Sequence, residues 1–332
     1  MTFNEGEWIE GVKVHNIRYF GKWAYPLRIL EVRNIVKKID PDVLHAHYVS
    51  HYGMYGALTG FKPFVVSAWG DDVLTEPERS RIKRHVVRYV LRKADAITCD
   101  AVHMRDAMLR LGAVPESINL INYGVDTIKF SPRRKSEEIK TKLGIQDSPT
   151  VISLRNLDPQ YDVESLINSI PLVLKEIPES KFLIAGRGSE ENRLKELAQS
   201  LGVSENTLFV GFIKNDELPN FLTSIDVYVS TSLSDAGISA ATAEAMACAI
   251  PIVITDVVDN RKWVDDGVSG FVVPIKDPKS LADRIIRLLK NEDLRRKFGM
   301  ISRKIIEERN DYYREMKKME SVYEGLAETH KK

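Results

Sequence analysis

A loop, a helix and a short strand within residues 231–255 carry the residues best suited to chemistry. The loop Ser234–Gly237 leads into a helix that we expect from Ile238 to Cys248, with no glycine or proline inside it. The first turn of a helix has unpaired N–H groups and the positive end of the helix dipole, which suit a phosphate. We therefore predict a diphosphate at Gly237–Ala241, with Glu244 reaching sugar hydroxyls. An ordinary buried strand–helix connection, with Glu244 in solvent, fits the pattern equally well.

A second group of candidate residues follows the strands of the C-terminal half. Arg155 and Asn156 come directly after an apolar strand at 150–154, and Gly186 comes directly after another at 182–185. In open α/β sheets, ligands bind beyond the carboxyl ends of the strands. An anionic nucleotide is expected to bind at this rim. The rim offers it a guanidinium, a backbone position without a side chain and the start of a helix.

The N-terminal half offers His45, His47, Trp69, Gly70 and Asp72 near the ends of two further apolar strands. The two histidines are spaced for one face of a strand. The sequence supplies no third ligand at metal spacing, so we predict no metal site, and either ring can instead pack or face solvent. Trp69 is placed to stack on a sugar ring, with core packing as the alternative.

The elements that position these residues alternate between strands and helices in both halves, which predicts α/β domains with parallel sheets covered by helices on both faces. Strands are expected at 12–19, 42–47, 63–68, 96–99, 118–121, 150–154, 182–185, 208–210, 226–231, 250–255 and 270–273. Helices are expected at 26–39, 79–93, 190–201, 216–224, 278–290 and 293–325, with others starting near Gly53 and Asp162. We predict a first doubly wound domain at 1–132, a linker at 133–148, a second domain at 149–308 and a C-terminal helix at 309–332.

Composition limits the classes of function. The chain has 332 residues, enough for about two domains, with 43% hydrophobic and 29% charged residues. The net charge of +1 gives no reason to expect a nucleic-acid partner. Two cysteines, Cys99 and Cys248, permit no disulfide framework, and no apolar run reaches the length of a membrane span. The first residues are polar and acidic and do not form a signal peptide, so we expect a cytoplasmic protein.

The run Glu244-Ala245-Met246-Ala247 before an apolar strand resembles the donor-site signature of retaining family 4 glycosyltransferases. The run Asn122–Asp126, followed by Phe130 and Pro132, resembles the motif that closes the first domain in that family. The resemblance extends over about residues 11–325. It implies a GT-B fold, in which two Rossmann-like domains face a cleft and the C-terminal helix packs back on the first domain. Compared with that family, this chain is expected to enter its first domain about two strands late.

The resemblance also implies roles for individual residues. Arg155 matches the arginine that neutralises the donor diphosphate, Glu244 the residue that binds ribose hydroxyls, and His47 a histidine that contacts the donor sugar. The catalytic set it implies is Asp235, Glu244 and His47, where Asp235 replaces a glutamate expected at Ala236. The donor-binding set is Arg155, Asn156, Gly186, Gly237, Ile238, Ser239, Ala240 and Glu244. The acceptor side is Trp69, Gly70 and Asp72, and no metal or other cofactor is expected.

Besides the late entry into the first domain, two departures at single residues accompany the resemblance. Ala236 is the first, and the second is Gln160, which stands where the family has a lysine at the leaving group. Arg187 and Lys262 are candidates to supply the missing cation.

Together these features predict a retaining, metal-independent glycosyltransferase that moves a sugar from a nucleotide-diphosphate sugar to a glycan, lipid or small-molecule acceptor. The alternatives are a non-catalytic or truncated glycosyltransferase-like subunit and a nucleotide-sugar epimerase of the same fold. The basic stretch Arg79–Lys93 is either a solvated helix face or a peripheral contact with the anionic inner face of a membrane.

Overall fold

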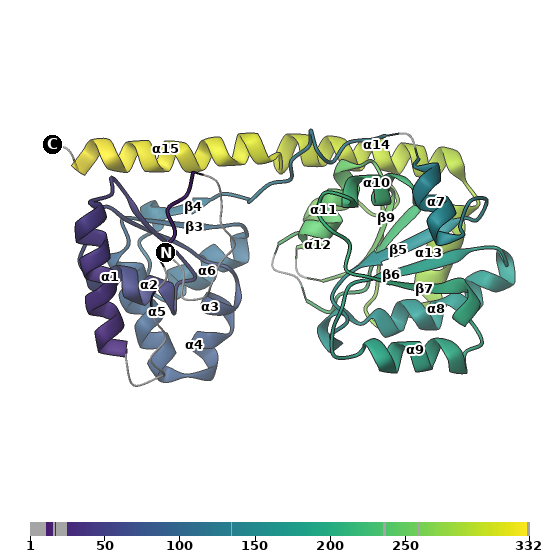
Figure 1. Ribbon diagram of the computed structural model, residues 1–332, viewed down its shortest axis with the longest axis horizontal. Coiled ribbons are helices and arrows are strands. Elements are labelled where there is room, and N and C mark those ends of the chain that lie inside the picture. Colours follow the sequence, from purple (N-terminus) through teal and green to yellow (C-terminus); the bar gives the residue numbers. More distant parts are fainter. Residues whose placement is uncertain are drawn as a thin grey trace. The chain divides into compact units, whose positions relative to one another are not determined.

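The computed structural model divides the chain into two compact units. The N-terminal unit comprises Met1–Asn122 and Met316–Lys332, and the C-terminal unit comprises Tyr123–Glu315. Both units are α/β structures, which confirms the predicted fold class (Figure 1). The structure describes residues 11–15, 17, 25–133, 135–234, 237–257 and 259–330.

The N-terminal unit contains a four-stranded parallel sheet in the order β1-β2-β3-β4. Its strands are β1 (Leu44–His47), β2 (Phe64–Ser67), β3 (Ala96–Cys99) and β4 (Ile118–Leu120). The two central strands are fully buried, as expected for a parallel sheet covered by helices. The helices are α1 (Tyr25–Ile39), α2 (Tyr52–Thr59), α3 (Asp71–Leu74), α4 (Glu76–Arg79), α5 (Arg81–Lys93) and α6 (Val102–Arg110).

Helix α5 begins two residues later than the sequence predicted. Arg79 ends α4, and the Ser80 side chain caps α5 by accepting a hydrogen bond from the Lys83 N–H at 3.4 Å. Val87 and Val90 are buried against the sheet, whereas Ile82 is 78% exposed. Only the later turns of this helix therefore bury apolar side chains against the sheet.

The C-terminal unit contains a six-stranded parallel sheet in the order β10-β9-β8-β5-β6-β7. Its strands are β5 (Thr150–Leu154), β6 (Lys181–Ala185), β7 (Thr207–Gly211), β8 (Val227–Ser230), β9 (Ile252–Thr255) and β10 (Phe271–Val273). Strands β6 and β7 lie on one side of β5, and β8, β9 and β10 lie on its other side in that order. The strand order therefore reverses between β5 and β8, and such a switch point is where open α/β sheets bind ligands.

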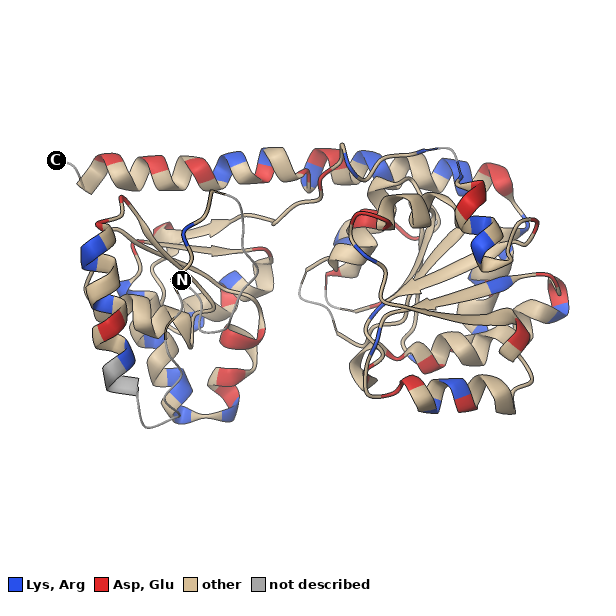
Figure 2. Ribbon diagram, viewed as in Figure 1, with Lys and Arg blue, Asp and Glu red and all other residues tan. Residues whose placement is uncertain are grey.

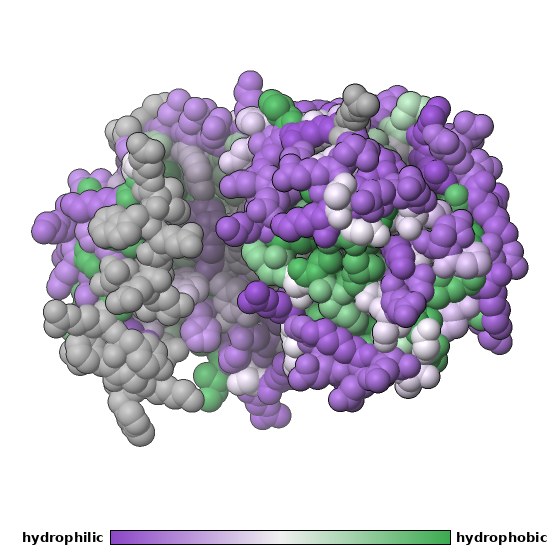
Figure 3. All heavy atoms as spheres, turned by 45° about the vertical axis from the view of Figure 1, so that its right-hand side comes forward, coloured by the Kyte–Doolittle hydropathy of each residue, from purple (hydrophilic) through white to green (hydrophobic). Residues whose placement is uncertain are grey.

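Helices cover both faces of this sheet: α7 (Glu137–Leu143), α8 (Val163–Glu176), α9 (Glu191–Ser200), α10 (Leu218–Thr223), α11 (Ala240–Ala247), α12 (Asn260–Trp263), α13 (Pro278–Leu289) and α14 (Glu292–Arg309). Alternate residues of a strand serve opposite cores, because Val151 packs in one buried cluster and Ile152 in the other. Charged residues lie mainly on the helices and loops (Figure 2). Polar residues also cover most of the face seen in Figure 3, with an apolar patch on the C-terminal unit.

The predicted linker at 133–148 belongs to the C-terminal unit. It contains α7, and Ile145 is completely buried in the core of that unit. The segment is therefore packed structure, which the abundance of charged residues in its sequence did not reveal. The sequence also predicted no helix where α6 lies. Residues 12–15 and 17 form no strand, and the rest of the strand expected at 12–19 lies outside the described residues.

The predicted C-terminal helix is two helices, α14 and α15 (Tyr312–His330), separated at Asn310 and Asp311. Gly124 has φ +73°, and a Cβ on it would lie 2.5 Å from Cα of Tyr312, so this turn requires glycine. Asp126 caps the same turn by accepting hydrogen bonds from the N–H groups of Ile128 and Lys129 at 3.0 and 2.9 Å. The turn predicted at this motif is confirmed.

Candidate functional site

Arg155 lies at the switch point of the six-stranded sheet. It follows β5 directly, and its Nη2 donates a hydrogen bond of 3.4 Å to Oγ of Ser232, which follows the neighbouring strand β8. The guanidinium carbon lies 4.5 Å from the centroid of the Tyr161 ring, a cation–π contact. These contacts hold the arginine at the carboxyl edge of the sheet, where the fold places ligands.

Backbone contacts fix the two loops that flank Arg155. The Leu233 N–H donates to the carbonyl of Gln160 at 2.9 Å, and the Thr231 hydroxyl donates to the carbonyl of Tyr161 at 2.9 Å. From β9, the Thr255 hydroxyl donates to the carbonyl of Ser232 at 2.5 Å. The loops after β5 and β8 therefore form one connected rim.

Gly186 brings the end of β6 against the same rim. Its φ is +131°, its N–H donates to the Gly211 carbonyl at 2.8 Å, and a Cβ on it would lie 2.2 Å from the Arg155 carbonyl oxygen. We expected this glycine to open the backbone to a ligand. The structure shows instead that the space is occupied by the Arg155 backbone, so Gly186 positions Arg155. Asn156, which directly follows Arg155 in the sequence, is exposed.

Helix α11 presents its first turn beside this rim. It begins at Ala240, two residues later than predicted, because the Ser239 side chain caps it by accepting a hydrogen bond from the Thr242 N–H at 3.3 Å. Gly237 has φ +72° and is buried, Ile238 is half-buried, and Ala240 is exposed. The first turn thus presents a helix N-terminus to solvent, as an anion site requires. Asp235 and Ala236 lie outside the described residues.

Glu244 lies one turn after Ala240 and so on the same side of α11. Burial raises the pKa of its carboxyl group from 4.5 to about 7, and the nearby Lys129 ammonium partly opposes the shift. Lys129 itself forms an ion pair with the Asp216 carboxylate at 3.0 Å. Glu244 is therefore poised to change its protonation state near neutral pH.

The rim also contains residues that the sequence analysis did not place there. Phe212 follows β7 at the carboxyl edge and is 71% exposed, which suits an aromatic platform. The apolar residues that precede Phe212 in the sequence do not indicate that its side chain is exposed. Of the two candidates for the second cation, Lys262 is paired with Asp259 at 2.7 Å, whereas Arg187 is exposed directly after Gly186. Arg187 is therefore the better candidate for the second cation.

The N-terminal unit brings His47 and Trp69 together at the carboxyl edge of its own sheet. His47 ends β1, Trp69 follows β2, and their ring centroids are 5.7 Å apart. The His45 ring lies 4.3 Å from that of His47. Desolvation lowers the pKa of His47, which keeps its imidazole neutral and able to exchange hydrogen bonds with a hydroxyl. Trp69 is 47% exposed, so it is not a core residue.

Asp72 supports this edge from inside. Its carboxylate is completely buried and accepts hydrogen bonds from the N–H groups of Val49 and Trp69 at 2.7 and 3.0 Å. Burial raises the pKa of Asp72, and the backbone donors oppose the increase. Gly70, with φ +111°, precedes helix α3. Both residues hold the loop that carries Trp69.

The residues that the structure describes lack two kinds of feature. They contain no group of three or more histidine, cysteine, aspartate or glutamate side chains that could hold a metal ion. None of the helices within these residues is long and apolar enough to cross a membrane.

Comparison with protein families gives two matches along the chain. Residues 135–305 match the family model of glycosyl transferases group 1, and residues 4–101 match the model described as glycosyl transferase 4-like. The first match covers the six-stranded sheet with Arg155, Gly186 and α11, and the second covers His47 and Trp69.

Among curated proteins, spore coat protein SA of Bacillus subtilis is 26% identical over 60% of this chain, and the match spans only 57% of that relative. N-acetyl-alpha-D-glucosaminyl L-malate synthase of Bacillus anthracis is 22% identical over 94% of this chain and 82% of its own length. Among solved structures, Anabaena HepE in complex with UDP has a TM-score of 0.78 at 20% identity, covering 90% of this chain and 82% of HepE. This last likeness establishes the fold.

Proposed function

The chain belongs to group 1 of the glycosyl transferases, and on that basis we propose that it is a retaining, metal-independent enzyme. It would move a sugar from a nucleotide-diphosphate sugar to a glycan, lipid or small-molecule acceptor. The observation that carries the proposal is the position of Arg155 at the switch point of the sheet, tied to Ser232 on one side and to Tyr161 on the other.

Each donor-side residue has a role that follows from its chemistry. The Arg155 guanidinium neutralises the charge that develops on the leaving diphosphate, which replaces the metal used for that purpose elsewhere. Backbone N–H groups at the start of α11 hold a phosphate. The ionised Glu244 carboxylate accepts hydrogen bonds from ribose hydroxyls, and Phe212 stacks on the base.

His47 is proposed to contact the donor sugar, as the resemblance implies, and Trp69 serves the acceptor side. A neutral imidazole can donate to or accept from a sugar hydroxyl, and an exposed indole can cover the apolar face of a sugar ring. In a retaining reaction of this kind, the leaving diphosphate takes the proton of the attacking hydroxyl on the same face. The protein then contributes charge and position and needs no nucleophile of its own.

A donor panel tests the proposal. The protein is titrated with UDP-, GDP-, ADP- and dTDP-sugars, and release of free nucleotide is followed with and without a chelator. UDP-sugars come first, because HepE is structurally similar and was solved with UDP and with UDP-glucose. We expect one donor class to bind and to be hydrolysed slowly, with no loss of rate on chelation.

Variants define the site within the same assay. Arg155→Ala should lower the rate about 10²–10³-fold, the usual effect of removing one electrostatic stabiliser. Arg193→Ala is the matched control, since Arg193 is exposed and pairs with Glu164 and Glu190 on the same unit. Failure of every donor to bind would overturn the proposal.

A non-catalytic subunit is the second candidate, and Gln160 favours it. Where the resemblance expects a lysine, this exposed residue contributes its backbone carbonyl to the loop contact with Leu233 and supplies no positive charge. Tight donor binding without nucleotide release, in the presence of added glycan and lipid extracts, would select this candidate. An Arg187→Gln variant that loses turnover would instead show that Arg187 supplies the charge.

Helix α5 supports a further proposal, of peripheral contact with an anionic membrane. Its exposed surface combines basic side chains such as Arg81 and Arg92 with the apolar side chains of Ile82 and Tyr89. Such a surface binds anionic headgroups and inserts shallowly. Equal sedimentation with neutral and with phosphatidylserine-containing vesicles would rule the contact out.

A further inference from the structure

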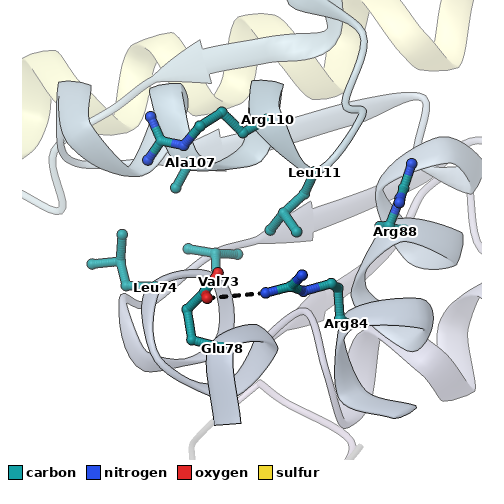
Figure 4. Close-up of a pocket in the computed structure, with 8 residues that line it drawn as sticks. All are labelled: Val73, Leu74, Glu78, Arg84, Arg88, Ala107, Arg110 and Leu111. Carbon is teal, nitrogen blue, oxygen red and sulfur yellow. Dashed lines mark hydrogen bonds and ion pairs between the residues drawn. The ribbon is translucent and has the colours of Figure 1, made fainter. Parts of the chain in front are cut away.

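A pocket of about 420 Å³ opens on the N-terminal unit among α3, α4, α5 and α6 (Figure 4). Neither His47 nor Trp69 lines it, so it is distinct from the edge described above. Its lining consists of Val73, Leu74, Glu78, Arg84, Arg88, Ala107, Arg110 and Leu111.

The lining is divided between apolar and charged side chains. Val73, Ala107 and Leu111 are buried and form an apolar floor, with Leu74 beside them. Around this floor stand three arginines and one glutamate, a formal excess of two positive charges. The size lies in the range of small-molecule sites, and the mixture of an apolar floor with a few charged groups is typical of them.

One arginine is already held in place. Nη2 of Arg84 donates to the Glu78 carboxylate at 2.9 Å, across the pocket in Figure 4, and Nε donates to the Pro77 carbonyl at 3.0 Å. Both side chains of the ion pair remain accessible, at 41% and 72% exposure. An exposed pair of this kind is weak, so a competing anion can replace Glu78 on Arg84.

The other two arginines have no such partner. Within the described part of the chain, the guanidiniums of Arg88 on α5 and Arg110 on α6 make no hydrogen bond or ion pair, and both are exposed. Figure 4 shows them on opposite sides of the apolar floor. Guanidinium groups bind phosphate oxygens in pairs and with favourable geometry.

We propose that this arginine pocket binds the phosphate group of a small amphiphile, whose apolar part lies on the floor formed by Val73, Ala107 and Leu111. Arg88 contacts the phosphate together with Arg84, its neighbour one turn earlier on α5, once Arg84 releases Glu78, and Arg110 adds positive charge from the other side of the floor. The pocket lies within one unit and does not depend on the transferase proposal. The same chemistry would serve a lipid-linked phosphate or free phosphate, and the apolar floor favours the former.

Calorimetric titration with hexyl phosphate, below its aggregation concentration, and with inorganic phosphate distinguishes the two sources. We expect hexyl phosphate to bind more tightly, by roughly fourfold for each methylene that the floor buries. Equal affinities would overturn the assignment of an amphiphile. Binding of anionic vesicles without binding of monomeric hexyl phosphate would also overturn it.

Variants distinguish binding inside the pocket from binding to basic side chains spread over the surface. Arg88→Gln should weaken hexyl phosphate binding by about tenfold or more, since it removes a charge-assisted hydrogen bond, and Arg110→Gln should weaken it less, since it removes only a nearby charge. Glu78→Gln should strengthen binding, because it removes the competing carboxylate. Arg33→Gln, at an exposed position on α1 and outside the pocket, is the matched control. An equal loss in that control would overturn the pocket, and thermal melting would confirm that all four variants fold.

Discussion

The hydroxyl of Tyr323 lies 2.6 Å from Nδ1 of His45, although 278 positions separate the two residues. Nε2 of the same ring lies 2.8 Å from Oγ of Ser67, which in turn lies 2.6 Å from Oγ1 of Thr98. A chain of hydrogen bonds therefore joins helix α15 to three adjacent strands, β1, β2 and β3, within the N-terminal unit.

Removal of the Tyr323 hydroxyl should weaken this unit. Tyr323→Phe leaves one ring nitrogen of His45 without its partner in a largely buried place, and we expect a loss of about 1–3 kcal/mol in the free energy of unfolding. Tyr312→Phe, on the same helix and 43% exposed, is the control and should have little effect. Urea unfolding measures both, and equal midpoints for the two variants would contradict the structural role of Tyr323.

Acid should also weaken this network. Burial, with a smaller contribution from His47, lowers the pKa of His45 from 6.5 to about 3. Between these values the unfolded chain binds the proton and the folded chain does not, so stability falls as the pH decreases from about 6.5 toward 3. A single group contributes up to about 1.4 kcal/mol per pH unit.

The variant His45→Asn isolates the contribution of the His45 imidazole, because the asparagine side chain does not titrate in this pH range. The difference in unfolding free energy between wild type and His45→Asn should shrink as the pH falls below 6.5. His85→Asn, at an exposed position on α5, is the control for the replacement of an imidazole. A constant difference for His45→Asn would show that its imidazole is not desolvated in the folded state.

Much of the fold was predictable because strands in a parallel sheet are continuous apolar runs. The strand at 150–154 and that at 96–99 were placed correctly for this reason. The turn at Gly124 and Asp126 was also predictable, since its chemistry is local. Arg155 could be placed at the rim because it directly follows a strand.

The rest depends on contacts between distant residues. Ile145 lies in a charged segment yet is buried, and Asp72 is a carboxylate whose partners come from two separate loops. The need for glycine at 186 comes from the Arg155 carbonyl, 31 positions earlier by the printed numbering. The arginine pocket combines side chains from α5 and α6, one of which the sequence analysis did not predict. Contacts between residues so far apart leave no periodic pattern in the sequence.

Gly186 should tolerate no side chain. An added Cβ meets the Arg155 carbonyl oxygen at 2.2 Å, a backbone atom that cannot turn away, and the φ of +131° is unfavourable for other residues. We expect Gly186→Ala to lower stability by about 1–3 kcal/mol and to displace Arg155, so donor affinity should fall with it. Gly202→Ala is the control for positive φ alone, since no atom lies within 4 Å of its Cβ position. Comparable donor affinity in the two variants would contradict the positioning role of Gly186.

Donor binding should follow the ionisation of Glu244. Burial raises its pKa to about 7, so the carboxyl group is largely protonated at pH 6 and ionised at pH 8. An ionised carboxylate is the better acceptor for ribose hydroxyls, and affinity should therefore increase with pH, by up to about tenfold per unit below pH 7, and then level off. Calorimetric titration of the nucleotide selected by the donor panel, at pH 6, 7 and 8, measures this. Glu244→Gln should bind weakly without the pH dependence, whereas Glu217→Gln, at an exposed position of the same unit, should behave as wild type. The same pH profile in Glu244→Gln as in wild type would assign the titration to another group.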